Sequence, residues 1–315
     1  VYKEGKPLIF DTHTDILYNI VEKRLRGQRG IVESYHIPEL LEGNVTGGIW
    51  TYYTDVNQLL HNNFDQAIHY IIEELEESPD VQVVTAKGDW ADHKVNVILG
   101  LESLASLRDI DHLVEIYEKG FRHAMLTWNE KNQFATGIGC KDGTGLSLLG
   151  CELIQKMNEL GMVIDVSHAS IQTFEDILSV TKEPVIASHS NCYSITPHPR
   201  NLTDEQIKEI ALVDGVIGVT AVPHFTNQLK PDVESLVDHI DYLRELVGTR
   251  HIALGFDFMN YLGDGHLESN LIDCQSASSA NNVIDELVNR GYSSMDIDGI
   301  THVNAKRVIN HILKD

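Results

Sequence analysis

The amino-acid sequence predicts an α/β protein, a (β/α)8 barrel of the TIM type, and two observations support this prediction. Eight short runs of apolar and β-branched residues alternate along the chain with longer stretches of helical periodicity. Strands that are apolar on both faces and separated by helices indicate a parallel sheet covered by helices. Eight such units in 315 residues favour a closed barrel, and we expect residues 1–315 to form a single domain. The alternation of strands and helices is also compatible with an open, doubly wound sheet, which is the alternative fold.

Each apolar run is predicted to form one strand of the barrel. The runs are Leu8–Asp11, Gly48–Tyr53, Val95–Leu101, His123–Thr127, Met162–Val166, Pro184–Ser188, Val216–Ala221 and His251–Phe256.

The segments between the runs are predicted to be helices, because their apolar residues recur three and four positions apart. Gly161 follows one of them as a plausible terminating glycine, and Thr203 precedes another as an N-cap with acidic residues in the first turn. The predicted helices are Phe64–Leu75, Leu148–Leu160, Ile171–Val180, Asp204–Leu212, Asp232–Val247 and Ala277–Arg290.

Composition excludes some classes of function. Acidic residues outnumber basic ones 47 to 24, and a net charge of −23 is unsuited to binding a nucleic-acid backbone. No apolar run reaches the roughly 18 residues that cross a bilayer, and the polar first residues show no secretory signal. The four cysteines are scattered without a CxxC spacing, so we expect reduced thiols and a cytoplasmic protein.

Metal-competent side chains follow five of the predicted strands. In a β/α barrel the carboxyl ends of the strands open onto one face, so these side chains are expected to converge there. His13 and Asp15 are two residues apart and point to the same side of an extended chain. Glu102 directly follows Val-Ile-Leu-Gly-Leu; it is either a partly desolvated carboxylate that needs a cation or a charged residue at the start of a helix. The set is His13, Asp15, Glu102, His168, His189 and Asp257.

Imidazoles and carboxylates without thiolates suit Zn²⁺, with Mn²⁺ or Co²⁺ as substitutes. Three histidines, an aspartate and a glutamate exceed the needs of one catalytic zinc and fit two ions that share a carboxylate, an arrangement that suits amide hydrolysis. The sequence contains no GxSxG, P-loop, dinucleotide or HExxH motif. The remaining histidines considered, which we expect to be ordinary core or surface residues, are His93, His112, His239, His251 and His311.

The order of these motifs resembles the membrane (renal) dipeptidase family of zinc peptidases over nearly the whole chain. The matching motifs are His-x-Asp near the N-terminus, an isolated Glu after the third strand, Ile-Asp-x-x-His at 164–168 and Ser-His-Ser at 188–190. The resemblance implies a β/α barrel that hydrolyses dipeptides, including those with a C-terminal D-residue, and often forms a homodimer. It also implies two zinc ions bridged by Glu102 and a water or hydroxide, with His13 and Asp15 on one ion and His168 and His189 on the other.

The resemblance extends to residues outside the metal set. Arg200 matches an arginine that binds the C-terminal carboxylate of the substrate, and Asp257 matches an aspartate that transfers the proton during attack and departure. Asp257 and Glu102 are therefore the expected catalytic residues. Trp128 stands where family members commonly have a histidine that stabilises the tetrahedral intermediate, and is expected to contact substrate. Met259 replaces a second aspartate that often follows the eighth strand. Two alternative functions remain. The chain is either another two-metal amidase or lactone hydrolase on the same barrel, or a non-catalytic binding protein.

Overall fold

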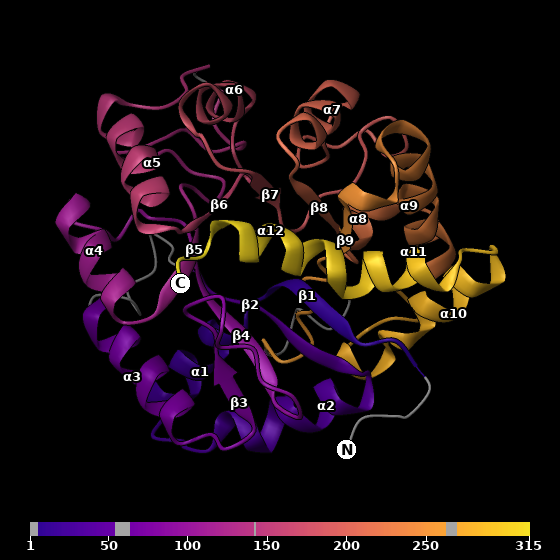
Figure 1. Cartoon of the computed structure of the whole chain (residues 1–315), viewed down its shortest axis with the longest axis horizontal. Helices are drawn as coiled ribbons and strands as arrows, with labels where there is room; N and C mark the ends of the chain where they lie inside the picture. Colours follow the sequence, from indigo (N-terminus) through magenta and orange to yellow (C-terminus); the bar gives the residue numbers. More distant parts are fainter. Residues whose placement is uncertain (1–5, 54–63, 142, 263–269) are drawn as a thin grey trace.

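The computed structural model describes residues 6–53, 64–141, 143–262 and 270–315, and its strands form one parallel sheet. Every predicted apolar run contains a strand (Figure 1). One short strand, β3, was not predicted because it has only three residues and two of them are partly exposed. The strands are β1 Ile9–Thr14, β2 Val45–Tyr53, β3 Val81–Val83, β4 Val95–Glu102, β5 Phe121–Met125, β6 Val163–Asp165, β7 Val185–Ala187, β8 Val216–Val219 and β9 Ile252–Leu254.

The sheet closes on itself. Its order is β2-β1-β9-β8-β7-β6-β5-β4-β3, and a further pairing between β2 and β4 completes a ring of eight strands, with β3 alongside the first half of β4. All the pairings are parallel. The closed (β/α)8 barrel is therefore confirmed and the open sheet is excluded.

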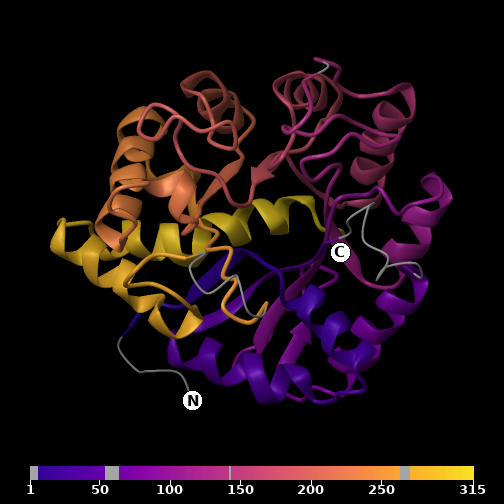
Figure 2. The ribbon, with the colours of Figure 1, turned by 180° about the vertical axis from the view of Figure 1, so that it is seen from behind.

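Helices cover the outside of this ring (Figures 1 and 2). The caps are those expected: Thr203 and Gln206 form a capping box, and Gly161 ends its helix with a φ of 77°. The predicted helix over residues 277–290 is a 3-10 turn followed by α10. The helices are α1 Ile16–Leu25, α2 Ile37–Glu42, α3 Phe64–Glu76, α4 Ile110–Glu118, α5 Leu148–Leu160, α6 Ile171–Val180, α7 Asp204–Leu212, α8 Pro223–Thr226, α9 Val233–Val247, α10 Asn281–Asn289, α11 Ser294–Asp298 and α12 Asn304–Ile312.

The helix α12 closes one end of the barrel interior. It crosses in front of the strands in Figure 1 and lies behind them in Figure 2. Its buried residues Val308 and Ile309 pack in one apolar cluster with inward-facing strand residues such as Phe10, Ile98 and Val216. This packing fills the end of the barrel away from the carboxyl ends of the strands and leaves those carboxyl ends for a site.

Candidate active site

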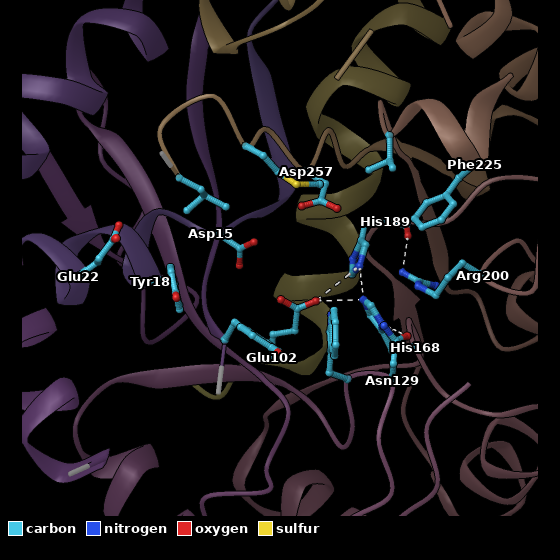
Figure 3. Close-up of a pocket in the computed structure, with 15 residues that line it drawn as sticks. Asp15, Tyr18, Glu22, Glu102, Asn129, His168, His189, Arg200, Phe225 and Asp257 are labelled. Carbon is cyan, nitrogen blue, oxygen red and sulfur yellow. Dashed lines mark hydrogen bonds and ion pairs between the residues drawn. The ribbon is translucent and has the colours of Figure 1, made fainter. Parts of the chain in front are cut away.

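A cavity of about 390 Å³ lies at the carboxyl ends of the strands (Figure 3). It brings together residues from segments far apart in the sequence, as the barrel predicts. The predicted site residues all line it except His13, which is buried against Glu102 and His189. The lining residues are Asp15, Tyr18, Glu22, Tyr53, Glu102, Trp128, Asn129, His168, His189, Arg200, Val222, Phe225, Asp257, Met259 and Leu262.

The carboxylate of Glu102, at the end of β4, lies between two groups of side chains. Its Oε1 is 3.0 Å from Nε2 of His168 and 3.7 Å from Nε2 of His189. Its Oε2 faces the other way and is 3.8 Å from Nε2 of His13, which in turn is 4.0 Å from Oδ1 of Asp15. Glu102 is thus not a solvated residue at a helix start, because it ends a strand and is 4% exposed.

The Nε2 atoms of the three histidines lie close together around Glu102. Nδ1 of His168 donates to Oδ1 of Asn129 at 3.0 Å, so Nε2 of the neutral ring carries a lone pair. That Nε2 lies 2.8 Å from Nε2 of His189, whose Nδ1 is 2.9 Å from the Ser188 hydroxyl. The buried Nε2 of His13 makes no hydrogen bond within the described chain. Imidazole nitrogens that converge on one buried carboxylate can act together as ligands, so these residues fit a metal ion.

Burial sets the protonation of these groups. It lowers the pKa of His13 to about 3 and the pKa values of His168 and His189 well below the ordinary value, so the rings are neutral, as metal ligands must be. Burial, and then the negative charge of Asp15, raise the pKa of Glu102 well above its usual range. A carboxylate in this position is stabilised by a bound cation.

Two buried aspartates to which the sequence analysis gave no role hold the ligand segments in place. Oδ1 of Asp165 accepts hydrogen bonds from the backbone N–H of Ser167 at 2.9 Å and of Ser188 at 3.1 Å. These serines immediately precede His168 and His189. The other oxygen of Asp165 accepts a hydrogen bond from Nε2 of His123 at 2.9 Å. Asp165 therefore connects the ends of β6 and β7.

Asp11 makes the corresponding connection between β1 and β9. Its Oδ1 accepts hydrogen bonds from the backbone N–H of His13 at 3.2 Å and of Phe256 at 2.9 Å. The predicted strand His251–Phe256 ends earlier, at Leu254, because the N–H of Phe256 bonds this side chain rather than a neighbouring strand. The only signal in the sequence is an aspartate shortly before a predicted ligand: Asp11 lies two residues before His13, and Asp165 lies three residues before His168.

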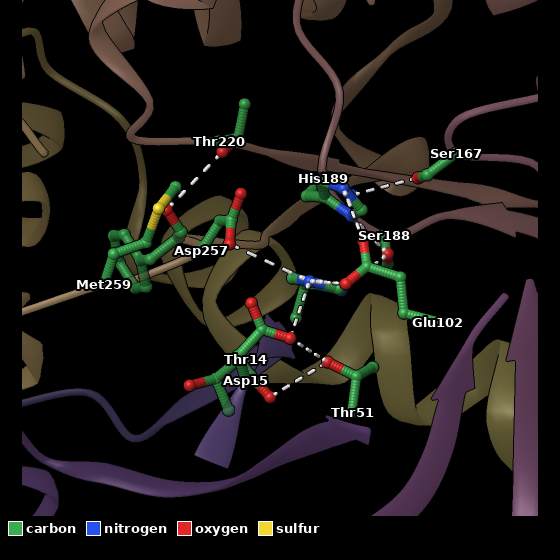
Figure 4. A network of polar contacts seen from close by, with 12 residues as sticks. Thr14, Asp15, Thr51, Glu102, Ser167, Ser188, His189, Thr220, Asp257 and Met259 are labelled. Carbon is green, nitrogen blue, oxygen red and sulfur yellow. Dashed lines mark hydrogen bonds and ion pairs between the residues drawn. The ribbon is translucent and has the colours of Figure 1, made fainter. Parts of the chain in front are cut away.

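The ligand side chains are also fixed by local geometry. Asp15 accepts a hydrogen bond from the Thr51 hydroxyl at 2.9 Å, and the N–H of His189 donates to the Ser167 hydroxyl at 3.3 Å (Figure 4). His168 and Asp257 have φ values of 64° and 58°, in the left-handed region that non-glycine residues rarely adopt. Such backbone strain concentrates at functional sites, where it turns the side chain away from the strand direction.

The other predicted residues surround the ligand cluster. Oδ1 of Asp257 is 3.8 Å from Nε2 of His13, and burial raises the pKa of Asp257 well above its usual range. Arg200 is buried; its Nη2 donates to the His189 carbonyl at 3.2 Å, and its Nε has no partner in the described chain. The Trp128 ring lies 5.8 Å from the His168 ring, centroid to centroid.

Fold and site together define a metal-dependent hydrolase on a β/α barrel. The sequence profile of the membrane dipeptidase family, peptidase family M19, matches residues 5–314. The chain belongs to this family and is a dipeptidase, a hydrolase of peptide bonds, as the sequence motifs predicted.

One relative is similar to the chain in sequence, and two solved structures are similar to it in fold. A dipeptidase of Aspergillus oryzae, aclJ, is 30% identical over 300 residues, which cover 87% of this chain and 69% of the relative. A crystal structure of a metallo peptidase, dipeptidase AC, superposes with a TM-score of 0.86 at 21% identity, covering 98% of this chain and 99% of the other. A Rhodobacter sphaeroides metallo peptidase, solved with a phosphinate mimic of L-Ala-D-Ala, has a TM-score of 0.83 at 20% identity and covers 98% and 100% of the two chains.

Proposed function

We propose that the chain is a dipeptidase with two zinc ions, one held by His13 and Asp15 and the other by His168 and His189, with Glu102 shared between them. The observation that carries this proposal is the orientation of Glu102, whose two oxygens face the two ligand groups separately. A donor set of imidazoles and carboxylates without a thiolate suits zinc. When bound, such a pair of ions polarises a carbonyl and lowers the pKa of water.

Arg200 is proposed to bind the C-terminal carboxylate of the dipeptide. Burial lowers its pKa to about 10, which still leaves the guanidinium charged at neutral pH. Within the described chain, the guanidinium donates a hydrogen bond from Nη2 to the His189 carbonyl, whereas its Nε has no partner. A planar guanidinium can form two parallel hydrogen bonds to a carboxylate, which fixes the substrate in register with the ligand cluster.

Asp257 is proposed to move the proton during hydrolysis. Its carboxylate lies at the edge of the ligand cluster and lines the cavity. There it can accept the proton that the attacking water loses and donate that proton to the nitrogen of the departing amine. The positive φ of Asp257 directs the side chain into the cavity rather than along the strand.

Trp128 is proposed to contact the substrate. It lines the cavity next to His168, and its indole can donate one hydrogen bond but cannot carry positive charge. A C-terminal D-residue is proposed to be accepted, and the mimic of L-Ala-D-Ala bound by the Rhodobacter sphaeroides metallo peptidase supports this.

The direct test combines metal analysis with an assay. We expect about two zinc ions per chain in protein purified without chelator, and hydrolysis of L-L and L-D dipeptides that a chelator abolishes and added zinc restores. Two zinc ions without cleavage of any dipeptide would favour a different amide or ester as substrate. Failure to bind zinc would contradict the ligand assignment.

Assembly and compartment are proposed from the sequence. We expect a homodimer in the cytoplasm, without nucleic acid as a partner, and sedimentation equilibrium tests the dimer. No helix in the described part of the chain is long and apolar enough to cross a membrane. All four cysteines are free thiols.

A further inference from the structure

The cavity has two ends of different character. Figure 3 shows Arg200 and Phe225 on one side of the ligand cluster and Tyr18 and Glu22 on the other, with Glu102 between them. A dipeptide whose C-terminal carboxylate binds Arg200 and whose peptide bond lies over the ligand cluster directs its N-terminal residue toward Tyr18 and Glu22. The side chains at that end therefore select the N-terminal residue of the substrate.

Three aromatic rings form a continuous wall from the ligand cluster to this end. The ring of Trp128 is 5.8 Å from that of His168, the ring of Tyr53 is 4.9 Å from that of Trp128, and the ring of Tyr18 is 6.2 Å from that of Tyr53. Such a wall can pack against a long aliphatic side chain and also attracts a cation through the ring faces.

Glu22 ends this wall with a carboxylate. Tyr18 and Glu22 are four residues apart on α1, so they lie on the same face of the helix. The other carboxylates lining the cavity, those of Asp15, Glu102 and Asp257, belong to the ligand cluster, whereas Glu22 does not.

The present partner of Glu22 can be replaced. Its Oε1 accepts a hydrogen bond from Nη2 of Arg26 at 2.6 Å, but the Arg26 side chain is 65% exposed and that of Glu22 is 25% exposed. Ion pairs of this kind are worth about 0–1 kcal/mol, so a cation inside the cavity can take the place of Arg26.

We propose that this end of the cavity is a subsite for a basic N-terminal residue, so that the preferred substrates are dipeptides beginning with lysine or arginine. The inference rests on the proposed function, because it uses Arg200 to orient the substrate. The aromatic wall packs against the methylene groups of the side chain, and Glu22 pairs with the cation at its tip. The net charge of −23 also favours the approach of a cationic substrate.

The test compares kcat/KM of the zinc-loaded enzyme for Lys-Ala, norleucyl-Ala and Glu-Ala. Norleucine keeps the four-carbon side chain of lysine but lacks the terminal ammonium group. We expect Lys-Ala to be preferred over norleucyl-Ala by about tenfold and Glu-Ala to be the poorest substrate. In Glu22→Gln the ratio of Lys-Ala to norleucyl-Ala should fall close to one. Glu115→Gln, which removes a carboxylate from an ion pair with Arg108 on the surface, should keep the ratio of the parent enzyme.

The outcomes separate this inference from the proposed function. Cleavage of all three dipeptides at similar rates would overturn the basic subsite and leave the dipeptidase in place. A uniform loss for all substrates in Glu22→Gln would mean that Glu22 binds the α-amino group, which also overturns it. If no dipeptide is cleaved, the proposed function itself fails.

Discussion

At the scale of single residues, the proposal that Glu102 is shared by two ions can be tested at each histidine separately. His168 presents Nε2 toward both Glu102 and His189. We predict that His168→Ala loses about one zinc per chain and almost all turnover, because a two-ion site acts as a unit. Zinc analysis and kcat measure both effects. His311→Ala, which removes an exposed histidine paired with Glu183, is the control and should retain both. Activity of His168→Ala with unchanged zinc content would contradict the assignment.

The planar guanidinium of Arg200 leads to a prediction about recognition of the substrate carboxylate. Arg200→Lys keeps a positive charge but loses the planar pair of donors. We predict that kcat/KM for a dipeptide falls roughly tenfold to a hundredfold, or about 1.4–2.7 kcal/mol. The same dipeptide with its C-terminus amidated should be a poor substrate for both the parent enzyme and Arg200→Lys. The two enzymes should differ much less in kcat/KM for this amide than for the free dipeptide. An equal loss of kcat/KM for the free and the amidated dipeptide would show that Arg200 does not bind the C-terminal carboxylate.

At the scale of elements, the ends of adjacent strands are joined by buried carboxylates. Asp165 joins β6 to β7 and Asp11 joins β1 to β9. We predict that Asp165→Ala lowers the zinc affinity about 10- to 100-fold, as loss of a residue behind the ligands typically does. Chelator competition measures it. Asp165→Asn keeps an oxygen for the two backbone N–H groups and should recover most of the affinity, whereas equal affinities in the two variants would contradict the role.

The packing of α9 against the loop after β7 predicts a dependence of stability on pH. His239 on α9 accepts a hydrogen bond from the N–H of Cys192 at Nδ1, 3.1 Å away, and its Nε2 donates to the Thr226 carbonyl at 2.9 Å. This pattern requires a neutral ring, and burial lowers the pKa of His239 to about 4. The unfolded chain, with a histidine pKa of about 6.5, therefore binds more protons between these values.

The stability that His239 contributes is full above about pH 6.5 and is lost as the pH falls toward 4. We predict that the unfolding free energy of the parent falls more steeply over this window than that of His239→Gln, by about 1.4 kcal/mol per pH unit. Urea unfolding at several pH values measures the difference. Parallel curves for the two proteins would show that His239 is not buried in its neutral form.

Element prediction from the sequence worked where a segment is a continuous apolar run, as in a buried strand, or where its apolar residues recur with helical spacing. All eight barrel strands satisfy this because they are buried on both faces. The helices α1, α2, α4, α8 and α11 were not predicted. Of these, α2, α8 and α11 are short, and α1 follows the site motif directly, so no change in polarity marks where the strand ends and the helix begins. The roles of Asp11, Asp165 and Asn129 were not predicted, because they depend on neighbours that only the closed barrel brings close.

At the scale of the whole molecule, the proposed metal site is expected to contribute to stability. Ions that bind the folded chain and not the unfolded one stabilise it by about 2.7 kcal/mol at a hundred times the dissociation constant. We predict that chelation lowers Tm by several degrees, because it also leaves the buried carboxylates of Glu102 and Asp257 without a cation, and that added zinc raises Tm again. Scanning calorimetry with and without chelator measures this. An unchanged Tm would mean that the ligand cluster does not bind metal in the folded protein.

The helix α12 has a consequence for biosynthesis. Its residues pack against strand residues from Phe10 onward, so the inner core contains both the first and the last described elements of the chain. A ribosome makes residues 304–312 after every strand of the barrel, and until then the inner ends of the strands lack their apolar cover. The nascent chain therefore completes its core only after residues 304–312 have been made, and peptide hydrolysis begins after that.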